Sequence, residues 1–582
     1  MFPPRLLGWL LVLMTVVAYL PAFQAGFIWD DDEYVTKNPL LTAPDGLWRI
    51  WFSLDSPSQY FPLTYTVFRL EYGLWGLLPS GYHAVNILLH ALNALLVWRV
   101  LARLRLPGAW LAAALFALHP VQVESVAWVT ELKSVLSLLF MLLAALAWLK
   151  FIGSPARPGW RWYLLALAGQ ALALAAKTTA CTLVAALGLM LWLKHLPLTR
   201  ARLAQMLPFA GLGAGMGLLT MWWERYHQGT QGKLFALGLP ERLLVAAHAL
   251  WFYLGKLLWP VNLTFSYPRW NLQPADPAAW GWVAATAGLV VALVWLRRRA
   301  GRGPEVAALF FALTLSPLLG FIMLYTFIYS FVADHYQYVA CLGPLTLAAA
   351  GLSLACGRWG GRRPWLQPLG CGLLLLTLGT LTWRQCGMYE GPETLWEATL
   401  QRNPGSWMAH DNLGGVLVHE GREEEAVEHW RKALKLKPDD AFTYYNLGMA
   451  ASQEGRVADA MAFYQQALDL DPDQVETDNK LAWILATSPL PALRNGPRAV
   501  ALAQHANQLA RGRNTGVLGT LAAALAEAGR FPEAVATVRQ ALPLAAARNE
   551  TTMVEDLRVQ LSFYQTNALF RDLSLTNNSL AH

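Results

Sequence analysis

Residues 6–38 read LLGWLLVLMTVVAYLPAFQAGFIWDDDEYVTKN, an apolar run of about twenty residues followed by a group of acids. A helix of about twenty apolar residues matches the thickness of a bilayer. The segment Phe27–Asn38, which we call the acidic stretch, contains Asp30, Asp31, Asp32 and Glu33. Carboxylates beside a bilayer are costly unless they reach water or serve a function. We therefore interpret the run as an uncleaved first membrane helix and the acidic stretch as a candidate site at its mouth.

The composition is that of a multi-pass membrane protein. Of 582 residues, 55% are hydrophobic, only 14% are charged and 27 are Trp, and the mean hydropathy is +0.33. The formal net charge of +7 does not indicate a nucleic-acid partner, because Lys and Arg fall mostly in short loops between apolar runs. The five Cys show no CxxC spacing, so neither a disulfide framework nor a zinc site is expected.

Eleven apolar runs are predicted to span a bilayer, at roughly 17–25 residues each. They lie near residues 6–25, 84–103, 109–127, 132–151, 162–177, 178–194, 204–223, 279–297, 304–323, 337–357 and 365–384. Lys and Arg concentrate in every second gap, near residues 99–105, 150–161, 194–202, 297–302 and 358–363, and such loops are typically cytoplasmic. The acidic stretch and the C-terminal part then lie on the far side of the membrane.

One further segment, residues 241–260, is apolar enough to be considered as a span. Its Arg242, His248 and Lys256 and its aromatic end favour instead a helix that lies in the membrane interface.

After Arg384 the sequence becomes Ala-rich, charged and repetitive. Asn412-Leu413-Gly414 recurs as Asn446-Leu447-Gly448, and other residues recur at the same spacing of 34: Gly421, Ala426, Ala433 and Pro438 return as Gly455, Ala460, Ala467 and Pro472. This spacing is the period of tetratricopeptide repeats. A further unit around Gly529 follows after six extra residues, which we expect in the loop Thr487–Gly496. Three or more repeats form a superhelix with a concave peptide-binding face.

The predicted fold is therefore all-α and has three parts. A polytopic membrane domain with about eleven transmembrane helices covers residues 1–385. A tetratricopeptide-repeat superhelix on the far side of the membrane covers residues 386–565, and a polar tail covers residues 566–582.

Polar residues from several far-side loops approach the membrane face that carries the acidic stretch. Asp30 and Asp31 are candidate general bases, since a carboxylate in a water-filled pocket can take a proton from a hydroxyl acceptor. Cations nearby can hold a phosphate group. The candidate phosphate-binding residues are Arg69, Lys133, Lys177 and His335, and the candidate supporting residues are Asn38, His83, His119, Glu124, Glu131 and Tyr338. Whether Asp30, Asp31 and Glu124 hold a divalent cation is left open by the sequence.

Structural interpretations compete with these roles. An acidic run after a membrane helix is often a solvated cap, His119 fits a helix end, and Lys177 fits a loop anchor. His83 and His90, on one helix face with Asn86, are more often interhelical hydrogen-bond partners than ligands.

Ordered motifs run from the acidic stretch to Val126. They comprise Phe27, Trp29, Asp30, Asp31 and Asn38; Pro62-Leu63-Thr64; Arg69, Tyr72, Leu74, Gly76-Leu77 and Pro79; His83, Asn86 and His90; and His119-Pro120, Glu124 and Val126. In this order they resemble the family of transmembrane and tetratricopeptide-repeat proteins with mannosyltransferase activity, together with bacterial relatives of the C-type membrane glycosyltransferase fold.

The resemblance implies transfer of a sugar, a hexose such as mannose, from a polyprenyl-phosphate lipid to a hydroxyl on an exported protein. The implied partners are membrane lipid, the lipid-linked sugar and an acceptor polypeptide that the repeats present. A bacterial inner membrane with periplasmic repeats is the expected location, and an endoplasmic reticulum membrane with lumenal repeats is the alternative.

Departures from the family pattern concern the donor side. The family has Arg at three positions where this chain has Phe61, Leu132 and His335, and the bacterial pattern has Asp where this chain has Ser134. If those arginines bind the donor phosphate, Lys133, Lys177 and Arg69 are the available substitutes, or the donor site is weakened.

Three other functions are alternatives to sugar transfer by a chain of this build. An oligosaccharide ligase or polymerase of similar build, and a membrane-tethered repeat scaffold without catalysis, stay open. A transporter is disfavoured, because the ionisable residues gather at one membrane face rather than along a midplane path.

Overall fold

The computed structural model describes residues 3–54, 58–153, 159–230, 232, 235–359 and 366–575. All regular secondary structure in these ranges is helical, which confirms the all-α prediction. The chain divides into two compact units, Met1–Pro404 and Gly405–His582. Parts of two predicted basic loops (residues 154–158 and 360–365) and the end of the polar tail (residues 576–582) lie outside the described residues.

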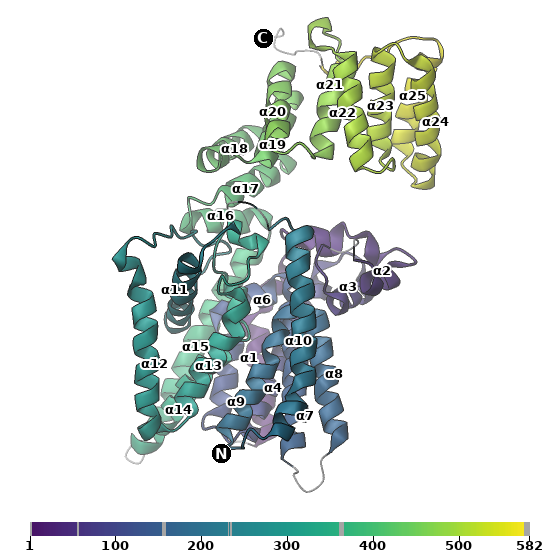
Figure 1. Ribbon diagram of the computed structural model, residues 1–582. Helices are drawn as coiled ribbons and strands as arrows, with labels where there is room; N and C mark the ends of the chain where they lie inside the picture. The colour runs from purple at the N-terminus through teal and green to yellow at the C-terminus, as the bar shows by residue number, and fades with distance from the viewer. Residues whose placement is uncertain are drawn as a thin grey trace. The chain divides into compact units, whose positions relative to one another are not determined.

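The first unit is a bundle of helices at the eleven predicted spans (Figure 1). They are α1 (Pro4–Ala18), α4 (Pro79–Arg103), α5 (Ala109–Leu118), α7 (Leu132–Ile152), α8 (Trp160–Ala176), α9 (Leu183–Leu193), α10 (Arg200–Tyr226), α12 (Gly281–Ala300), α13 (Gly303–Leu315), α14 (Leu342–Trp359) and α15 (Leu366–Cys386). At the centre α7 packs against α8 and α4, and α5 packs against α4 and α14.

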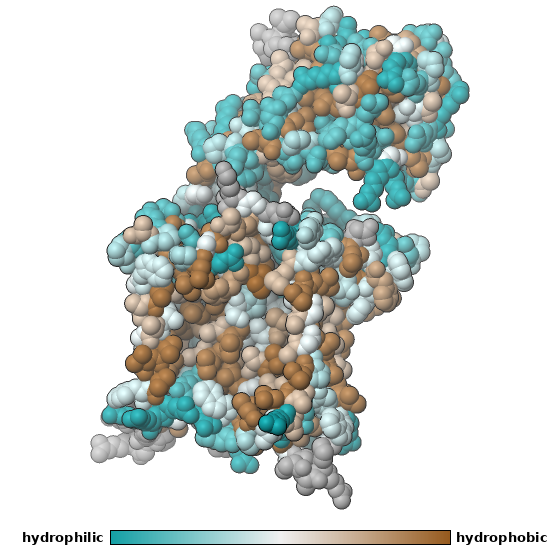
Figure 2. Space-filling view, viewed as in Figure 1, coloured by the Kyte–Doolittle hydropathy of each residue, from teal (hydrophilic) through white to brown (hydrophobic). Residues whose placement is uncertain are grey.

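Membrane-spanning character is clearest in four stretches of this unit. Among the described residues, the helices long and apolar enough to cross a membrane are Pro79–Arg103, Val129–Ile152, Arg200–Tyr226 and Pro277–Ala300. The pair Ala109–Leu118 and Pro120–Ala127, bent by 57°, makes a fifth if it counts as one span. Figure 2 shows apolar side chains in a band around the visible face of this unit, with hydrophilic side chains beyond both edges. The count of eleven stays a prediction.

Five further helices complete this unit: α2 (Gly46–Phe52), α3 (Pro62–Trp75), α6 (Val123–Ala127), α11 (Leu239–Leu258) and α16 (Pro392–Arg402). Helix α11 covers the segment expected in the interface, and it is not among the helices that pass the length and hydropathy test. Helix α16 belongs to the first unit, although the composition changes earlier, near residue 385. Its Trp396 packs edge-on against Trp29 and Phe265, which are also in this unit.

Two interruptions bring polar residues close to the ends of apolar helices. Helix α5 ends at Leu118 because Pro120 has no amide hydrogen and cannot continue a helix. The chain bends there and resumes as α6. Helix α8 ends at Ala176, and Lys177 precedes a 3₁₀ turn at Thr178–Thr182 that leads into α9. The carbonyl of Ala176 accepts a hydrogen bond from Thr64 at 3.0 Å, which fixes the second interruption beside the first loop.

The second unit is a stack of helix pairs that ends in a single helix. The pairs are α17 (Trp407–His419) with α18 (Glu423–Leu436), α19 (Ala441–Gln453) with α20 (Val457–Leu470), α21 (Val475–Thr487) with α22 (Gly496–Leu509), and α23 (Thr515–Glu527) with α24 (Phe531–Ala547), followed by α25 (Thr551–Gln565). The connection inside the third pair is residues 488–495, whereas the other pairs are joined by residues 420–422, 454–456 and 528–530. The extra residues therefore lie mainly where the sequence places them.

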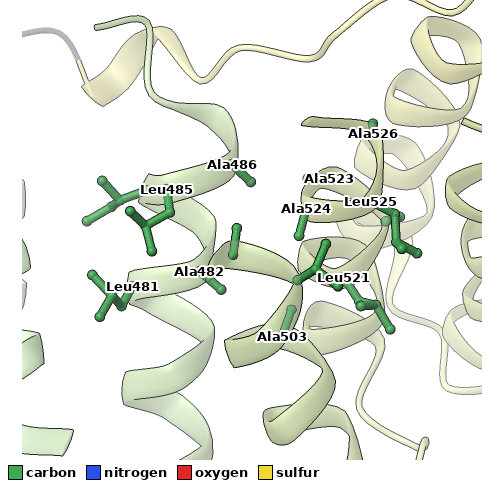
Figure 3. Packing of buried hydrophobic residues seen from close by; sticks show 14 of the residues in the cluster. Leu481, Ala482, Leu485, Ala486, Ala503, Leu521, Ala523, Ala524, Leu525 and Ala526 are labelled. Atoms are coloured by element: carbon green, nitrogen blue, oxygen red, sulfur yellow. The ribbon is translucent and has the colours of Figure 1, made fainter. Parts of the chain in front are cut away.

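Small residues allow the paired helices to touch. A Cβ on Gly414 would lie 2.5 Å from the indole nitrogen of Trp430, and a Cβ on Gly448 would lie 2.6 Å from the ring of Tyr464. Between α21, α22 and α23, alanines alternate with leucines in a closely packed core (Figure 3): Leu481, Ala482, Leu485, Ala486, Ala503, Leu521 and Ala523–Ala526. This spacing explains why the repeat keeps Gly and Ala at fixed positions.

Candidate functional site

Glu131 is the centre of a buried group of charges in the first unit. Its carboxylate lies 3.0 Å from the Lys177 ammonium and 3.3 Å from the Lys133 ammonium, and it accepts a hydrogen bond from Ser134. The Glu131 side chain is fully buried, and those of Lys133 and Lys177 are 9% and 13% exposed. A buried carboxylate is costly unless it is paired, and here two cations stabilise it.

A second carboxylate holds the histidine of the same group. Glu124 accepts hydrogen bonds from the backbone N–H of His335 at 3.1 Å and from its ring Nδ1 at 2.9 Å. The other ring nitrogen lies 3.9 Å from Glu131. We call Glu124, Glu131, Lys133, Lys177 and His335 the charged cluster, since the fold joins them from the two helix interruptions and the loop before α14.

Asp31 is tied into the backbone. It is fully buried, and its two carboxylate oxygens accept hydrogen bonds from the Ile28 N–H at 2.8 Å and from both the N–H and the hydroxyl of Thr130, at 2.8 and 2.6 Å. Burial raises the pKa of Asp31 to about 7, although these hydrogen bonds lower it. Asp31 therefore joins the acidic stretch to the segment that begins α7.

Asp30 is less constrained than its neighbour. It is partly exposed, and its carboxylate lies 3.5 Å from the Tyr325 hydroxyl, the long limit of a hydrogen bond. Burial raises the pKa of Asp30 to about 6, and the charge of Lys133 opposes that rise. A carboxyl group with a pKa near neutrality and free lone pairs has the properties of a general base. Of the two predicted aspartates, the geometry favours Asp30.

A strained residue separates the roles of the two aspartates. Trp29 has φ of +41°, in the left-handed region that large side chains rarely adopt. Its ring is held by stacking on Trp128, with centroids 5.7 Å apart, and by an edge contact with Phe265 at 5.2 Å. The turn that follows directs Asp31 to Thr130 and Asp30 to Tyr325.

Two cavities lie along the same helices, and the polar one adjoins the charged cluster. The polar cavity, about 20 Å³, is lined by Ser134, Ser137, Lys177, Thr179, Thr182, Thr314, Leu318, His335, Tyr336, Tyr338 and Val339. The apolar cavity, about 160 Å³, is lined almost entirely by aliphatic residues of α4, α7, α9, α13 and α14. Along α7 the lining passes from Ser137 to Leu142, and along α13 from Thr314 to Phe310. The linings of the two cavities are therefore about one helical turn apart along α7 and α13.

The other predicted site residues make local structural contacts. Arg69 donates to the Leu40 carbonyl at 2.6 Å, Asn38 caps a turn by accepting from the Leu40 N–H, and His83 and His119 contact the carbonyls of Ala25 and Leu257. Tyr338 contacts His90 at 2.8 Å and also lines the polar cavity. These contacts hold Arg69, Asn38, His83 and His119 to backbone groups outside the charged cluster.

The positions where the family pattern has Arg fall into two environments. Phe61 and Leu132 are buried in one hydrophobic cluster with Tyr65 and Phe68, so an arginine there would lack a polar partner. His335 instead faces Glu124 and Glu131. Only the third position therefore has the surroundings of a cation site.

A divalent cation at Asp30, Asp31 and Glu124 finds no assembled donor set. Among the described residues, no group of three or more His, Cys, Asp or Glu is placed to hold a metal ion. The oxygens of Asp31 are engaged by Thr130 and Ile28, and those of Glu124 by His335.

Sequence reasoning missed the residues that shape the site without carrying a motif. Tyr325 reaches Asp30, and Glu224 at the end of α10 accepts from the Tyr325 N–H at 3.0 Å. Thr130 anchors Asp31. A buried acid such as Glu224 in an apolar helix was the one available signal.

Comparison with known proteins gives a match to a repeat family and matches to individual proteins. A family model described as tetratricopeptide repeat matches residues 406–473, the first two helix pairs of the second unit. Protein O-mannosyl-transferase TMTC4 of Homo sapiens is 32% identical over 200 residues, which cover 29% of this chain and 27% of that protein. Over this stretch the chain is similar to a protein that carries the name protein O-mannosyl-transferase.

Two further proteins with this name match a similar share of the chain. Protein O-mannosyl-transferase F38B6.6 of Caenorhabditis elegans is 30% identical over 155 residues, covering 24% of this chain and 22% of that protein. Protein O-mannosyl-transferase Tmtc1 of Drosophila melanogaster is 36% identical over 147 residues, covering 23% and 17%. The matches thus span about a quarter or less of the length of these relatives. The resemblance to mannosyltransferases with tetratricopeptide repeats is confirmed at this level.

Proposed function

We propose that the chain is a membrane glycosyltransferase that moves a hexose such as mannose from a polyprenyl-phosphate donor to a hydroxyl of a polypeptide. The relationship to proteins named O-mannosyl-transferases supports the reaction class. The observation that carries the proposal is the partly exposed carboxyl group of Asp30. Burial raises its pKa, and the charge of Lys133 in the charged cluster lowers it.

Asp30 acts as the general base. The acceptor hydroxyl gives its proton to Asp30 while its oxygen forms a bond to the anomeric carbon of the sugar. The bond from that carbon to the phosphate oxygen breaks, and its electron pair stays on the lipid phosphate. Asp31 holds the acidic stretch in place rather than taking the proton, because its carboxylate oxygens already accept hydrogen bonds from Thr130 and Ile28.

The charged cluster receives the phosphate. Lys177 and His335 both line the polar cavity, and Lys133 lies between Glu131 and the aromatic rings of Tyr34 and Trp128, with its ammonium 4.9 and 5.5 Å from the ring centroids. Glu131 pairs with both lysines and holds them in place before the donor binds. Charge-assisted hydrogen bonds to the leaving phosphate replace the arginines of the family pattern at Phe61 and Leu132.

The apolar cavity accommodates the lipid. A polyprenyl chain is hydrophobic, and the apolar cavity offers aliphatic walls about one helical turn from the polar cavity. Burial of the chain contributes roughly 25 cal/mol for each Å² of apolar surface removed from water. A phosphate at Lys177 and a lipid between α9, α13 and α14 fit one elongated donor.

The test is a transfer assay with purified full-length protein, radiolabelled polyprenyl-phosphate mannose and an acceptor peptide mixture. We expect transfer by the wild type and a loss of roughly 10²–10⁴-fold in Asp30→Asn, the usual contribution of a general base. Asp32→Asn is the matched control, since Asp32 is exposed and pairs with Lys37. Equal activity in Asp30→Asn and wild type contradicts the base assignment, and absence of transfer by the wild type contradicts the proposed reaction.

A further inference from the structure

The C-terminal segment of the chain folds back onto the repeats. After α25 ends at Gln565, residues 568–575 return across the ends of α23 and α21. The ring of Phe570 lies 5.9 Å from the ring of Trp483 on α21, and Leu575 is buried in the core of the repeats. The contacted helices α21 and α23 are the first members of their pairs, and the segment meets both at their C-terminal ends.

Two adjacent residues of the segment make specific polar contacts. Asp572 accepts a hydrogen bond from the indole N–H of Trp483 at 2.8 Å, and its backbone N–H donates to the Thr487 carbonyl at 3.0 Å. Arg571 donates to the Ala486 carbonyl at 2.9 Å and forms an ion pair with Glu527 at 2.7 Å. The repeats therefore bind the Arg571-Asp572 pair through both of its side chains and through the backbone of Asp572.

The receiving end of α21 differs from the ends of its equivalents. Helices α17, α19 and α23 are each followed by a glycine of positive φ (Gly421, Gly455 and Gly529), and the next residue donates back to the helix at 2.8 Å. The position equivalent to these glycines in the third pair is Pro489, which cannot adopt this cap. The carbonyls of Ala486 and Thr487 are thus left for Arg571 and Asp572.

The cation suits this position for a second reason. The C-terminal end of a helix carries partial negative charge, which favours a guanidinium group there. Glu527 at the end of α23 adds a full negative charge and is also bound by Arg494 at 3.2 Å. The site therefore offers a carboxylate, two carbonyl acceptors and an indole donor to the segment.

We propose that Trp483, Glu527 and the end of α21 form a peptide-binding site on the repeats, which the chain's own Phe570–Asp572 segment occupies as a resident ligand. Its partner is an extended polypeptide segment in which an aromatic residue precedes an Arg-Asp pair. The segment leaves when such a partner takes the same contacts. This site does not depend on the proposed transfer reaction, because it needs neither sugar nor lipid.

Tethering sets how strongly the resident segment competes. A linked segment acts at an effective concentration in the millimolar range, so a free peptide binds the intact chain more weakly than a chain without the segment. The polar contacts of Arg571 and Asp572 provide the specificity, since they are made by side chains that are partly exposed and can exchange with solvent.

The experiment measures binding of a fluorescent peptide with the sequence of residues 566–576 to the full-length protein and to a variant that ends at Gln565. We expect saturable binding to the truncated variant, and binding at least about tenfold weaker to the wild type. A peptide with both charges reversed, Arg571→Glu and Asp572→Lys, should not bind. A truncated variant with wild-type helicity and no saturable binding overturns the proposal and leaves the segment as a structural cap.

A second variant decides the case if truncation prevents folding. The full-length double variant Arg571→Ala/Asp572→Ala keeps Phe570 and Leu575 but removes the competing side chains. It should bind the labelled peptide at least several-fold more tightly than the wild type does. Equal binding by the two proteins, or equal binding of the native and charge-reversed peptides, overturns the proposal.

Discussion

The carboxylate of Asp31 accepts two hydrogen bonds from Thr130, one from the backbone N–H at 2.8 Å and one from the hydroxyl at 2.6 Å. These two residues are 99 positions apart, so this contact fixes the acidic stretch to the start of α7. The same start of α7 carries Glu131, the centre of the charged cluster. Asp31 therefore determines where Asp30 stands relative to the cations.

Substitution of Asp31 should act mainly through structure. In Asp31→Asn the amide NH₂ replaces one acceptor oxygen and faces a donor, so we expect a loss of about 1–3 kcal/mol in the free energy of unfolding. Thr130→Val removes only the hydroxyl and should cost less. Thermal unfolding and sugar transfer measured on both variants separate the effects. An inactive Asp31→Asn with unchanged stability would show that Asp31 itself takes the proton.

The pH dependence of transfer should report Asp30. A general base must be ionised, and burial raises the pKa of Asp30 to about 6. Activity should therefore fall as the pH decreases through about 6 and level off above it. The ammonium of Lys133 lowers this pKa, so in Lys133→Met the falling limb should move to higher pH. A limb that stays in place in this variant would contradict the electrostatic link between the two residues.

Loss of Lys177 should weaken binding of the donor more than binding of the acceptor. In Lys177→Gln we expect the KM for polyprenyl-phosphate sugar to rise about tenfold, the equivalent of ~1.4 kcal/mol for one charge-assisted contact. Lys37→Gln is the control, because the Lys37 side chain is 76% exposed and forms an ion pair with Asp32, outside the charged cluster. A rise in acceptor KM alone would move the phosphate away from the polar cavity.

Filling the apolar cavity should discriminate between donors by lipid length. Val306 on α13 lines this cavity, so Val306→Trp should raise the KM for long-chain donors and affect short-chain analogues little. Val290→Trp on α12 is the matched control, since Val290 is 55% exposed and is not among the lining residues. Equal effects on both donor lengths would place the lipid elsewhere.

Neighbouring glycines of α17 should respond oppositely to alanine. A Cβ on Gly414 meets Trp430 at 2.5 Å, so Gly414→Ala should destabilise the repeats by about 1–3 kcal/mol through overpacking. A Cβ on Gly415 meets nothing within 4 Å, and Gly415→Ala should be neutral or stabilise by up to about 1 kcal/mol. Chemical denaturation followed by far-UV circular dichroism checks both. Equal destabilisation by the two variants would mean that α17 and α18 are not in contact at this position.

Repeats and helix positions could be predicted because each depends on local sequence. The spacing of 34 residues, the apolar runs and the prolines that interrupt helices are all visible in the sequence. The grouping of Glu124, Glu131, Lys133, Lys177 and His335 also follows from the alternation of basic loops, which assigns these residues to one membrane face.

The direction of each side chain could not be predicted from a motif. Arg69, predicted to bind phosphate, instead donates to a carbonyl of the first loop, and His83 and His119 bond to backbone carbonyls. The division of work between Asp30 and Asp31 depends on the positive φ of Trp29, which no residue pattern specifies. Tyr325 and Thr130 became partners of the aspartates only through packing across long sequence separations.

The pairing of Glu131 with Lys133 and Lys177 has a consequence for biogenesis. The carboxylate and one ammonium lie at the start of α7, and the other ammonium lies just beyond α8, so Lys177 meets Glu131 only when α7 and α8 lie side by side. Because an unpaired charge resists burial among lipids, we expect α7 and α8 to enter a bilayer most readily as a hairpin with Lys177 already beside Glu131. A chain that loses Glu131 would present two ammonium groups without a counter-charge to the insertion machinery before any substrate is met.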